Sequence, residues 1–215
     1  MNDPKYQTGD PPAASDLSDD SIIISSDTLR ENRVPPGQSR TKKWPVLDAH
    51  GTPIFDTDQW ELKIFGLVET EVSLNRDQFS ALPRVQVFSD FHCVTKWSRL
   101  GNLWEGVSTK TILDLVTVSP DAKFAILHGY DHGWTTNLPL EDFLSDDALL
   151  ADLHDGVPID ADHGGPIRGM VPKLYAWKSA KWIKGIELSA TDKPGYWERG
   201  GYHNHGDPWT EERFG

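Results

Sequence analysis

The chain has 215 residues and a single cysteine, and its 33 acidic against 21 basic residues give a formal net charge of −12. This length supports one ordinary hydrophobic core. The negative charge excludes a general nucleic-acid binder or a binder of anionic membranes, because both need a positive surface. One cysteine excludes an intramolecular disulfide and a zinc site built from several thiolates. No apolar run approaches the length that spans a bilayer, so we expect no membrane insertion.

The first 31 residues differ in composition from the rest. They are rich in Ser, Asp and Pro, and seven acidic against two basic side chains give them a net charge of −5. Such a segment buries little apolar surface, so we expect a flexible acidic N-terminal tail over residues 1–31 and a folded domain over residues 32–215. Within the tail, Ile22-Ile23-Ile24 is a candidate edge strand. Residues 1–40 contain neither paired arginines nor a basic start followed by an apolar run, which predicts a cytoplasmic protein.

The folded region is dominated by patterns typical of short strands. Residues 60–66 and 84–88 alternate apolar and polar side chains with period two, which predicts half-buried strands. Residues 123–128 and 182–188 are further strand candidates.

Helical patterns are fewer and shorter. Asn75, with Gln78 three residues on, predicts a capped helix that Pro83 ends. Residues 112–116 and 139–144 predict two more helices. No βαβ period or internal repeat is present, so the expected class is α+β, mixed and strand-rich with few short helices.

One segment has a charge opposite to that of the whole chain. Residues 163–184 contain five basic side chains and no acidic one. In it, Gly164 and Gly165 allow a close approach to a ligand, and Arg168 offers a planar fork suited to phosphate or carboxylate. Ser179-Ala180-Lys181 adds a hydroxyl, backbone N–H groups and an ammonium. We expect an anionic ligand here, and a basic face solvated by water is the alternative.

The cysteine follows a predicted strand, in Phe91-His92-Cys93-Val94-Thr95-Lys96-Trp97-Ser98. A free cysteine is usually a small buried hydrophobe. Cationic neighbours such as His92 and Lys96 favour the thiolate. A thiolate is either a nucleophile or one soft ligand of a transition metal.

Several motifs, in this order along the chain, carry a family resemblance. They are His92–Ser98, Trp104–Val107, His163–Arg168 with Val171-Pro172, and Lys178–Trp182. Together they resemble the molybdopterin-binding domain of the sulfite oxidase family, over residues 32–214. The chain is most similar to the small stand-alone sulfite oxidase-like oxidoreductases, which are related to the catalytic subunit of the molybdenum-dependent methionine sulfoxide reductase. Residues 32–215 would then form the molybdopterin-binding oxidoreductase domain.

The resemblance implies a cofactor and residues that hold it. The cofactor would be Mo-molybdopterin with a single pterin, with no heme in this chain, and Cys93 matches the cysteine that binds molybdenum. Residues near the open coordination position would be Lys96 and His128, with Cys93 as the third catalytic candidate. The residues implied to bind the cofactor are Asn32, Arg33, His92, His163, Arg168, Ser179, Ala180 and Lys181.

The resemblance also has a departure that bears on the substrate. Sulfite oxidases carry an arginine in a Cys-x-x-Asn-Arg context, where this chain has Cys93-Val94-Thr95-Lys96-Trp97. Sulfite is therefore not implied, and we expect oxygen-atom transfer to or from a small S-oxide, N-oxide or oxyanion. A separate, unidentified electron donor or acceptor would be needed. Two alternatives remain: a non-catalytic molybdopterin carrier, and a thiol hydrolase pairing Cys93 with His92 or His128.

Two groups of other residues are assigned mainly structural roles. His203, His205 and Asp207 have ligand chemistry, but hydrogen-bonded packing in a Gly- and Trp-rich loop is the favoured interpretation. The nine tryptophans are expected to be core and loop anchors rather than a ligand cage.

Overall fold

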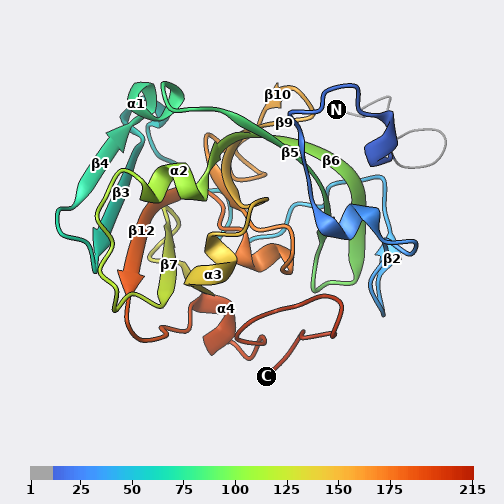
Figure 1. Cartoon of the computed structure of the whole chain (residues 1–215). Coiled ribbons are helices and arrows are strands. Elements are labelled where there is room, and N and C mark those ends of the chain that lie inside the picture. Colours follow the sequence, from blue (N-terminus) through green and yellow to red (C-terminus); the bar gives the residue numbers. More distant parts are fainter. Residues whose placement is uncertain (1–11) are drawn as a thin grey trace.

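The structure is a computed structural model, and it describes residues 12–215. Residues 1–11, the first part of the expected tail, lie outside the described residues. Two sheets make up most of the molecule, with one at each side in the view of Figure 1. The α+β, strand-rich class with few short helices is confirmed.

The larger sheet holds the strands around the cysteine. It has the order β1 (Ile23–Ile24), β5 (Val85–His92), β6 (Trp97–Ser108), β9 (Leu149–His154) and β10 (Val157–Pro158). In addition, β2 (Ser39–Arg40) pairs with β6, and β11 (Arg168–Met170) pairs with β9. The smaller sheet has the order β4 (Val72–Asn75), β3 (Glu61–Gly66), β12 (Ile183–Ser189), β7 (Phe124–Gly129) and β8 (Thr135–Pro139).

The helices are short, with three to five residues each. The α-helices are α1 (Arg76–Ser80), α2 (Thr109–Leu113), α3 (Leu140–Phe143) and α4 (Tyr196–Arg199). The 3₁₀ turns are η2 (Ala14–Asp16), η3 (Ser26–Leu29), η4 (Thr57–Gln59) and η5 (Ala176–Lys178). The capping box before α1 is confirmed, because Asn75 and Gln78 exchange both hydrogen bonds, each 2.9 Å long. The helix expected at 112–116 begins earlier, because Ser108 caps it by accepting from the Thr111 N–H.

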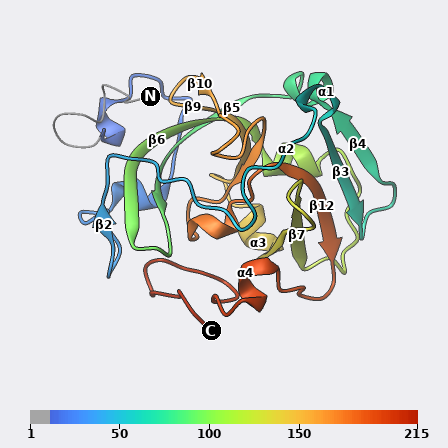
Figure 2. The same ribbon diagram turned by 180° about the vertical axis from the view of Figure 1, so that it is seen from behind.

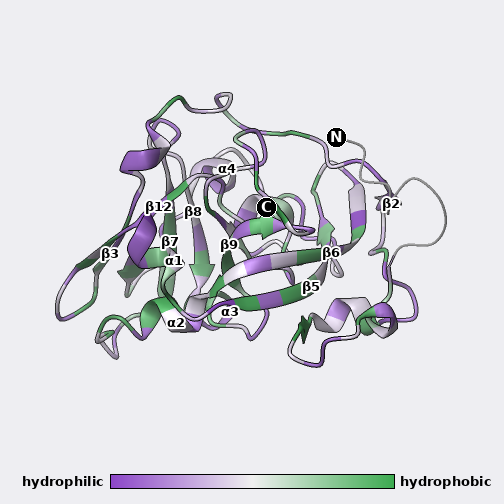
Figure 3. Cartoon of the chain, turned by 90° about the horizontal axis from the view of Figure 1, so that it is seen from above, coloured by the Kyte–Doolittle hydropathy of each residue, from purple (hydrophilic) through white to green (hydrophobic). Residues whose placement is uncertain are grey.

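The alternation in β3 explains how the smaller sheet forms its core. Leu62 and Ile64 are fully buried, whereas Glu61 and Lys63 are exposed. β5 behaves differently, since its last six residues are all buried. Figure 3 accordingly shows hydrophobic and hydrophilic bands mixed along β5 and β6. A sheet covered on both faces needs no strict alternation.

Residues 23–30 of the expected tail pack on the body. β1 pairs in parallel with β5, with Ile23 opposite Val87. In η3, the Asp27 carboxylate accepts a 2.7 Å hydrogen bond from the Trp209 indole, and the Arg30 guanidinium lies 3.9 Å from the centroid of that ring. The chain then runs through β2 in the larger sheet and, as Figure 2 shows, passes over to the smaller sheet, where it forms β3.

Candidate functional site

A pocket of about 160 Å³ lies where five segments of the chain meet. Its lining comes from residues 44–49, 91–97, 131–134, 168–182 and 197–202. Four of the residues singled out from the sequence line it together: Cys93, Arg168, Ser179 and Lys181. The cysteine and the basic segment, 75 positions apart between Cys93 and Arg168, therefore share one cavity.

Cys93 lies in a tight turn between β5 and β6. Its N–H donates to the Trp97 carbonyl at 2.9 Å, and the Lys96 N–H donates back to the Cys93 carbonyl at 3.0 Å. Lys96 closes the turn in the left-handed region, with φ of +70°. The Thr95 hydroxyl donates to the Cys93 sulfur at 3.2 Å. The turn thereby holds the sulfur at the pocket wall.

The electrostatics of the thiol differ from the sequence-based expectation. Burial raises the pKa of Cys93, although the Thr95 hydrogen bond and the charge of Arg213 act in the opposite direction. The two neighbours expected to favour a thiolate do not contact the sulfur in the described structure. Lys96 is exposed, and His92 is a buried residue whose Nδ1 lies 2.8 Å from the Ser98 hydroxyl. Burial and the Arg33 charge hold the pKa of His92 at about 4, against the pull of Asp90.

Arg168, on β11, is a buried cation at the pocket wall. Its guanidinium donates to the His163 carbonyl at 2.6 Å and to the Ser179 carbonyl at 3.0 Å. Within residues 12–215 no carboxylate forms an ion pair with it. Burial lowers the pKa of Arg168 to about 9. A desolvated cation without a carboxylate partner suits an anionic ligand.

Lys181 is the second cation at the wall. Its ammonium donates to the Asp162 carbonyl at 2.6 Å, and burial together with the Arg168 charge lowers its pKa to about 8. A Cβ on Gly164, which has φ of +102°, would lie 2.8 Å from the Lys181 side chain. Gly164 therefore lets the chain pack on itself, rather than leaving room for a ligand as the sequence suggested.

The neighbours of these cations act inside the protein framework. The Ser179 hydroxyl accepts from the Val171 N–H at 3.0 Å. Ala180 is fully buried in the core and does not line the pocket. His163 stacks on Trp44 with 4.0 Å between ring centroids, and its Nε2 lies 3.0 Å from the Trp44 carbonyl. His163 thus supports Trp44, which does line the pocket.

Five other sequence-predicted residues lie outside the pocket lining. Asn32 is exposed, and its side chain accepts from the Val34 N–H. Arg33 forms an ion pair with buried Asp90 at 2.6 Å. His128, on β7, lies 3.1 Å from Glu187. The remaining two residues are His92 and Lys96, described above.

Aromatic side chains dominate the wall of the pocket. From the sequence, the tryptophans were expected to be core and loop anchors rather than a ligand cage. Six of the nine tryptophans line the pocket together with Tyr202: Trp44, Trp97, Trp134, Trp177, Trp182 and Trp197. Two buried polar atoms of the lining, Trp97 Nε1 and Asp131 Oδ1, have no hydrogen-bond partner among the residues that the structure describes. The abundance of tryptophan was visible in the sequence, but its gathering from five segments had no local signal.

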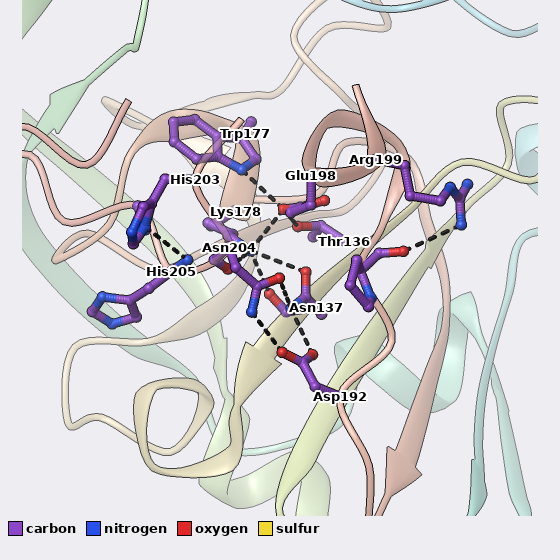
Figure 4. Close-up of polar contacts among 12 residues, drawn as sticks. Thr136, Asn137, Trp177, Lys178, Asp192, Glu198, Arg199, His203, Asn204 and His205 are labelled. Atoms are coloured by element: carbon purple, nitrogen blue, oxygen red, sulfur yellow. Dashed lines mark hydrogen bonds and ion pairs between the residues drawn. The ribbon is translucent and has the colours of Figure 1, made fainter. Parts of the chain in front are cut away.

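A buried polar network, drawn in Figure 4, includes Trp177, which lines the pocket. The Lys178 ammonium, with a fully buried side chain, lies 2.6 Å from Glu198 and donates to the carbonyls of Asn137 and Asn204. Glu198 also accepts from the Trp177 indole at 2.9 Å. Lys178 is therefore a structural member of the basic segment, whereas Arg168 and Lys181 are available to a ligand in the pocket.

The C-terminal histidines have the structural role that the sequence favoured. The His205 ring lies 2.9 Å from both Asp142 and Glu212. Throughout the described chain, no group of three or more His, Cys, Asp or Glu side chains is arranged to hold a metal ion.

The fold and pocket define a strand-rich protein in which two basic side chains and a thiol line one cavity. Residues 49–197 match the family model of the oxidoreductase molybdopterin binding domain, and the chain belongs to this family. The family inferred from the motifs is confirmed, so the protein is an oxidoreductase of the molybdopterin-binding class.

Three similar proteins differ in their sequence identity to this chain and in the share of it that they cover. The uncharacterized oxidoreductase YuiH of Bacillus subtilis is 46% identical over 186 residues, which cover 86% of this chain and 93% of YuiH. The protein-methionine-sulfoxide reductase catalytic subunit MsrP of Campylobacter jejuni is 24% identical, over 86% of this chain and 66% of MsrP. The sulfane dehydrogenase SoxCD of Paracoccus pantotrophus has a similar fold, with a TM-score of 0.61 at 21% identity, over 66% of this chain and 41% of that one.

The pocket fits the family's cofactor on three observations. Arg168 and Lys181 offer desolvated positive charge for a phosphate. Trp97 Nε1 and Asp131 Oδ1 are a donor and an acceptor without partners within residues 12–215. Cys93 provides a sulfur at the same wall. None of the helices between residues 12 and 215 has the length and hydrophobicity of a transmembrane span.

Proposed function

We propose that the protein is a molybdenum-dependent oxidoreductase of the sulfite oxidase type, with Cys93 as the protein ligand of the metal. The reaction would be oxygen-atom transfer to or from a small S-oxide, N-oxide or oxyanion. The observation that carries the proposal is the single pocket shared by Cys93, Arg168, Ser179 and Lys181. When bound, the molybdenum centre supplies the two-electron redox chemistry.

Cys93 provides the attachment point for the metal. Because burial raises the pKa of its thiol, the free side chain keeps its proton, and metal binding must release that proton. The Thr95 hydroxyl, 3.2 Å from the sulfur, stabilises the resulting thiolate.

The cationic side of the pocket would hold the phosphate end of the cofactor. Arg168 and Lys181 neutralise its charge, and Ser179, in the same segment, donates its hydroxyl proton to it. His163 contributes by holding Trp44. Neither Lys96 nor His128 lines the pocket, and neither takes part in the proposed chemistry.

The aromatic wall limits the size and polarity of the substrate. Indole rings leave a narrow, largely apolar space, which suits a small molecule and strengthens electrostatic interactions inside it. Arg99, in the region where sulfite oxidases carry a sulfite-binding arginine, is buried and bonded to His154 and Asp155. The family's sulfite site is therefore not reproduced by this side chain. Electrons would pass to or from a separate partner.

The thiol hydrolase alternative lacks its central contact. It requires a histidine within hydrogen-bond reach of the nucleophile. No histidine lines the described pocket, and the hydrogen-bond partner of the Cys93 sulfur is Thr95.

Replacement of Cys93 tests the proposal. Cys93→Ala and Cys93→Ser, made in a host that synthesises molybdopterin, should lose most molybdenum by elemental analysis and all turnover of S-oxides, N-oxides and sulfite with artificial electron donors or acceptors. Lys96→Ala is the matched control, since it changes an exposed residue of the same turn and should keep both. Unchanged molybdenum and turnover in Cys93→Ala would refute the ligand assignment. A molybdenum-loaded wild type that turns over none of these compounds would instead favour the carrier.

A further inference from the structure

We propose that Arg213 is a positioning residue for the Cys93 sulfur: it fixes the turn that presents the sulfur and places a positive charge beside it. This inference rests on the proposed function of Cys93. Arg213 lies 120 positions from Cys93 and outside the matched family region, residues 49–197.

The geometry joins three distant parts of the chain at one guanidinium. Arg213 is 8% exposed. Its Nη1 donates to the Val94 carbonyl at 3.0 Å, and its Nη2 donates to the Pro36 carbonyl at 3.1 Å. The guanidinium also lies 5.2 Å from the centroid of the Tyr175 ring. Arg213 is thus held in one orientation, with its charge against the residue that follows Cys93.

Two side chains from outside the turn hold its successive carbonyls. Gln38 donates to the Cys93 carbonyl at 2.9 Å, and Arg213 donates to the Val94 carbonyl. Both contacts fix the backbone on which the sulfur stands. They differ in one respect, because Gln38 is neutral and Arg213 is charged. This difference allows anchoring and charge to be separated by experiment.

The charge of Arg213 lies one residue along the chain from the sulfur. Its Nη1 is 3.0 Å from the carbonyl oxygen of Val94, the residue that follows Cys93. The guanidinium has an ion pair with Glu211, which is exposed and 3.8 Å from Nε, so that acid compensates the charge only partly. A cation beside a metal-bound thiolate favours the more negative, reduced state of the centre, and groups around a ligand tune a metal in this way.

Four variants of the cofactor-loaded protein test the proposal. They are Arg213→Met, Arg213→Lys, Gln38→Ala and, as an arginine control on α4, Arg199→Met. Amide hydrogen exchange of residues 93–97 measures the order of the turn. The molybdenum reduction potential, followed by electron paramagnetic resonance, measures the charge.

Arg213→Met should speed exchange of the turn about tenfold or more and lower the potential. Gln38→Ala should speed exchange but leave the potential unchanged. Arg213→Lys should keep the wild-type potential, and it serves as the test if Arg213→Met does not fold. Arg199→Met should match the wild type in both measurements.

Two results would overturn the inference. One is wild-type exchange in Arg213→Met. The other is a potential that moves equally in Gln38→Ala and Arg213→Met, since the role would then be structural alone. The exchange measurement can also be made on protein without cofactor, so it remains informative if Cys93→Ala shows that the proposed ligand is wrong.

Discussion

Arg168 is 2% exposed, and its guanidinium donates hydrogen bonds to backbone carbonyls. Burial lowers its pKa to about 9, which is the sign of a charge that is costly to desolvate. Such a cost is compensated when an anion binds beside the cation. We therefore propose that the side chain serves ligand binding as well as the packing of β11.

Arg168→Met should weaken retention of molybdopterin by about tenfold or more, because it removes a desolvated charge-assisted contact. The pterin released on denaturation, measured by fluorescence, reports this loss. Arg84→Met removes a surface arginine paired with Asp152 and should retain wild-type pterin. Equal pterin content in the two variants would show that Arg168 does not bind the cofactor.

Asp131 should make stability depend on pH. It is 3% exposed, and burial raises its pKa to about 6, above the value of about 3.9 expected for the unfolded chain. The folded state therefore favours the protonated acid. The contribution of protonated Asp131 to the free energy of unfolding is fully present below about pH 4. It is lost as the pH rises to and beyond 6. Asp131→Asn should be more stable than the wild type by about 1–2 kcal/mol at pH 8, and equal to it at pH 4.

Urea denaturation across this pH range measures the effect. A difference between the two proteins that stayed constant from pH 4 to 8 would mean that Asp131 does not titrate in the folded protein.

Residues whose partners are close in sequence were the predictable ones. Asn75 and Gln78 are three positions apart, so their capping box follows from the sequence. The contact between Arg213 and Val94 spans 119 positions, and no local pattern announces it. Cys93 was identified by its motif, whereas the direction of its pKa shift depends on burial, which only the folded structure supplies.

Among the elements, β6 was not predicted although it is the longest strand. Eight of its twelve residues are buried and the other four are half-buried, because β5 and β9 flank it and both of its faces are covered. Gly106 lies within it, where a Cβ would be 1.9 Å from the Leu150 carbonyl. A glycine usually indicates a turn, but here it permits two strands to approach. The strand β3, between β4 and β12, was predictable because one of its faces meets solvent.

The elements η5 and α4 bring Trp177 and Trp197 to the pocket, and the Lys178–Glu198 pair joins them. Lys178→Met leaves the Glu198 carboxylate buried without its cation, so it should lower the free energy of unfolding by about 3–5 kcal/mol. Thermal or urea denaturation measures this. The double variant Lys178→Met/Glu198→Gln should recover part of the loss, and no recovery would argue against direct coupling of the pair.

At the scale of the whole molecule, the N-terminal segment is part of the packed body from Ile23 onward. Deletion of residues 1–31 removes the β1–β5 pairing and the Asp27–Trp209 hydrogen bond. It should lower the free energy of unfolding by more than about 1 kcal/mol, since buried partners lose their hydrogen bonds. Comparison of melting temperatures tests this, and an unchanged value would support the flexible tail expected from composition.

The pocket wall draws on residues from Trp44 to Tyr202. No fragment of the chain can therefore assemble it alone, and a ligand that binds there selects the completely folded molecule over every partly opened form. Loading with cofactor should accordingly protect both sheets against proteolysis at once, so that occupancy sets the lifetime of the entire protein rather than of one loop.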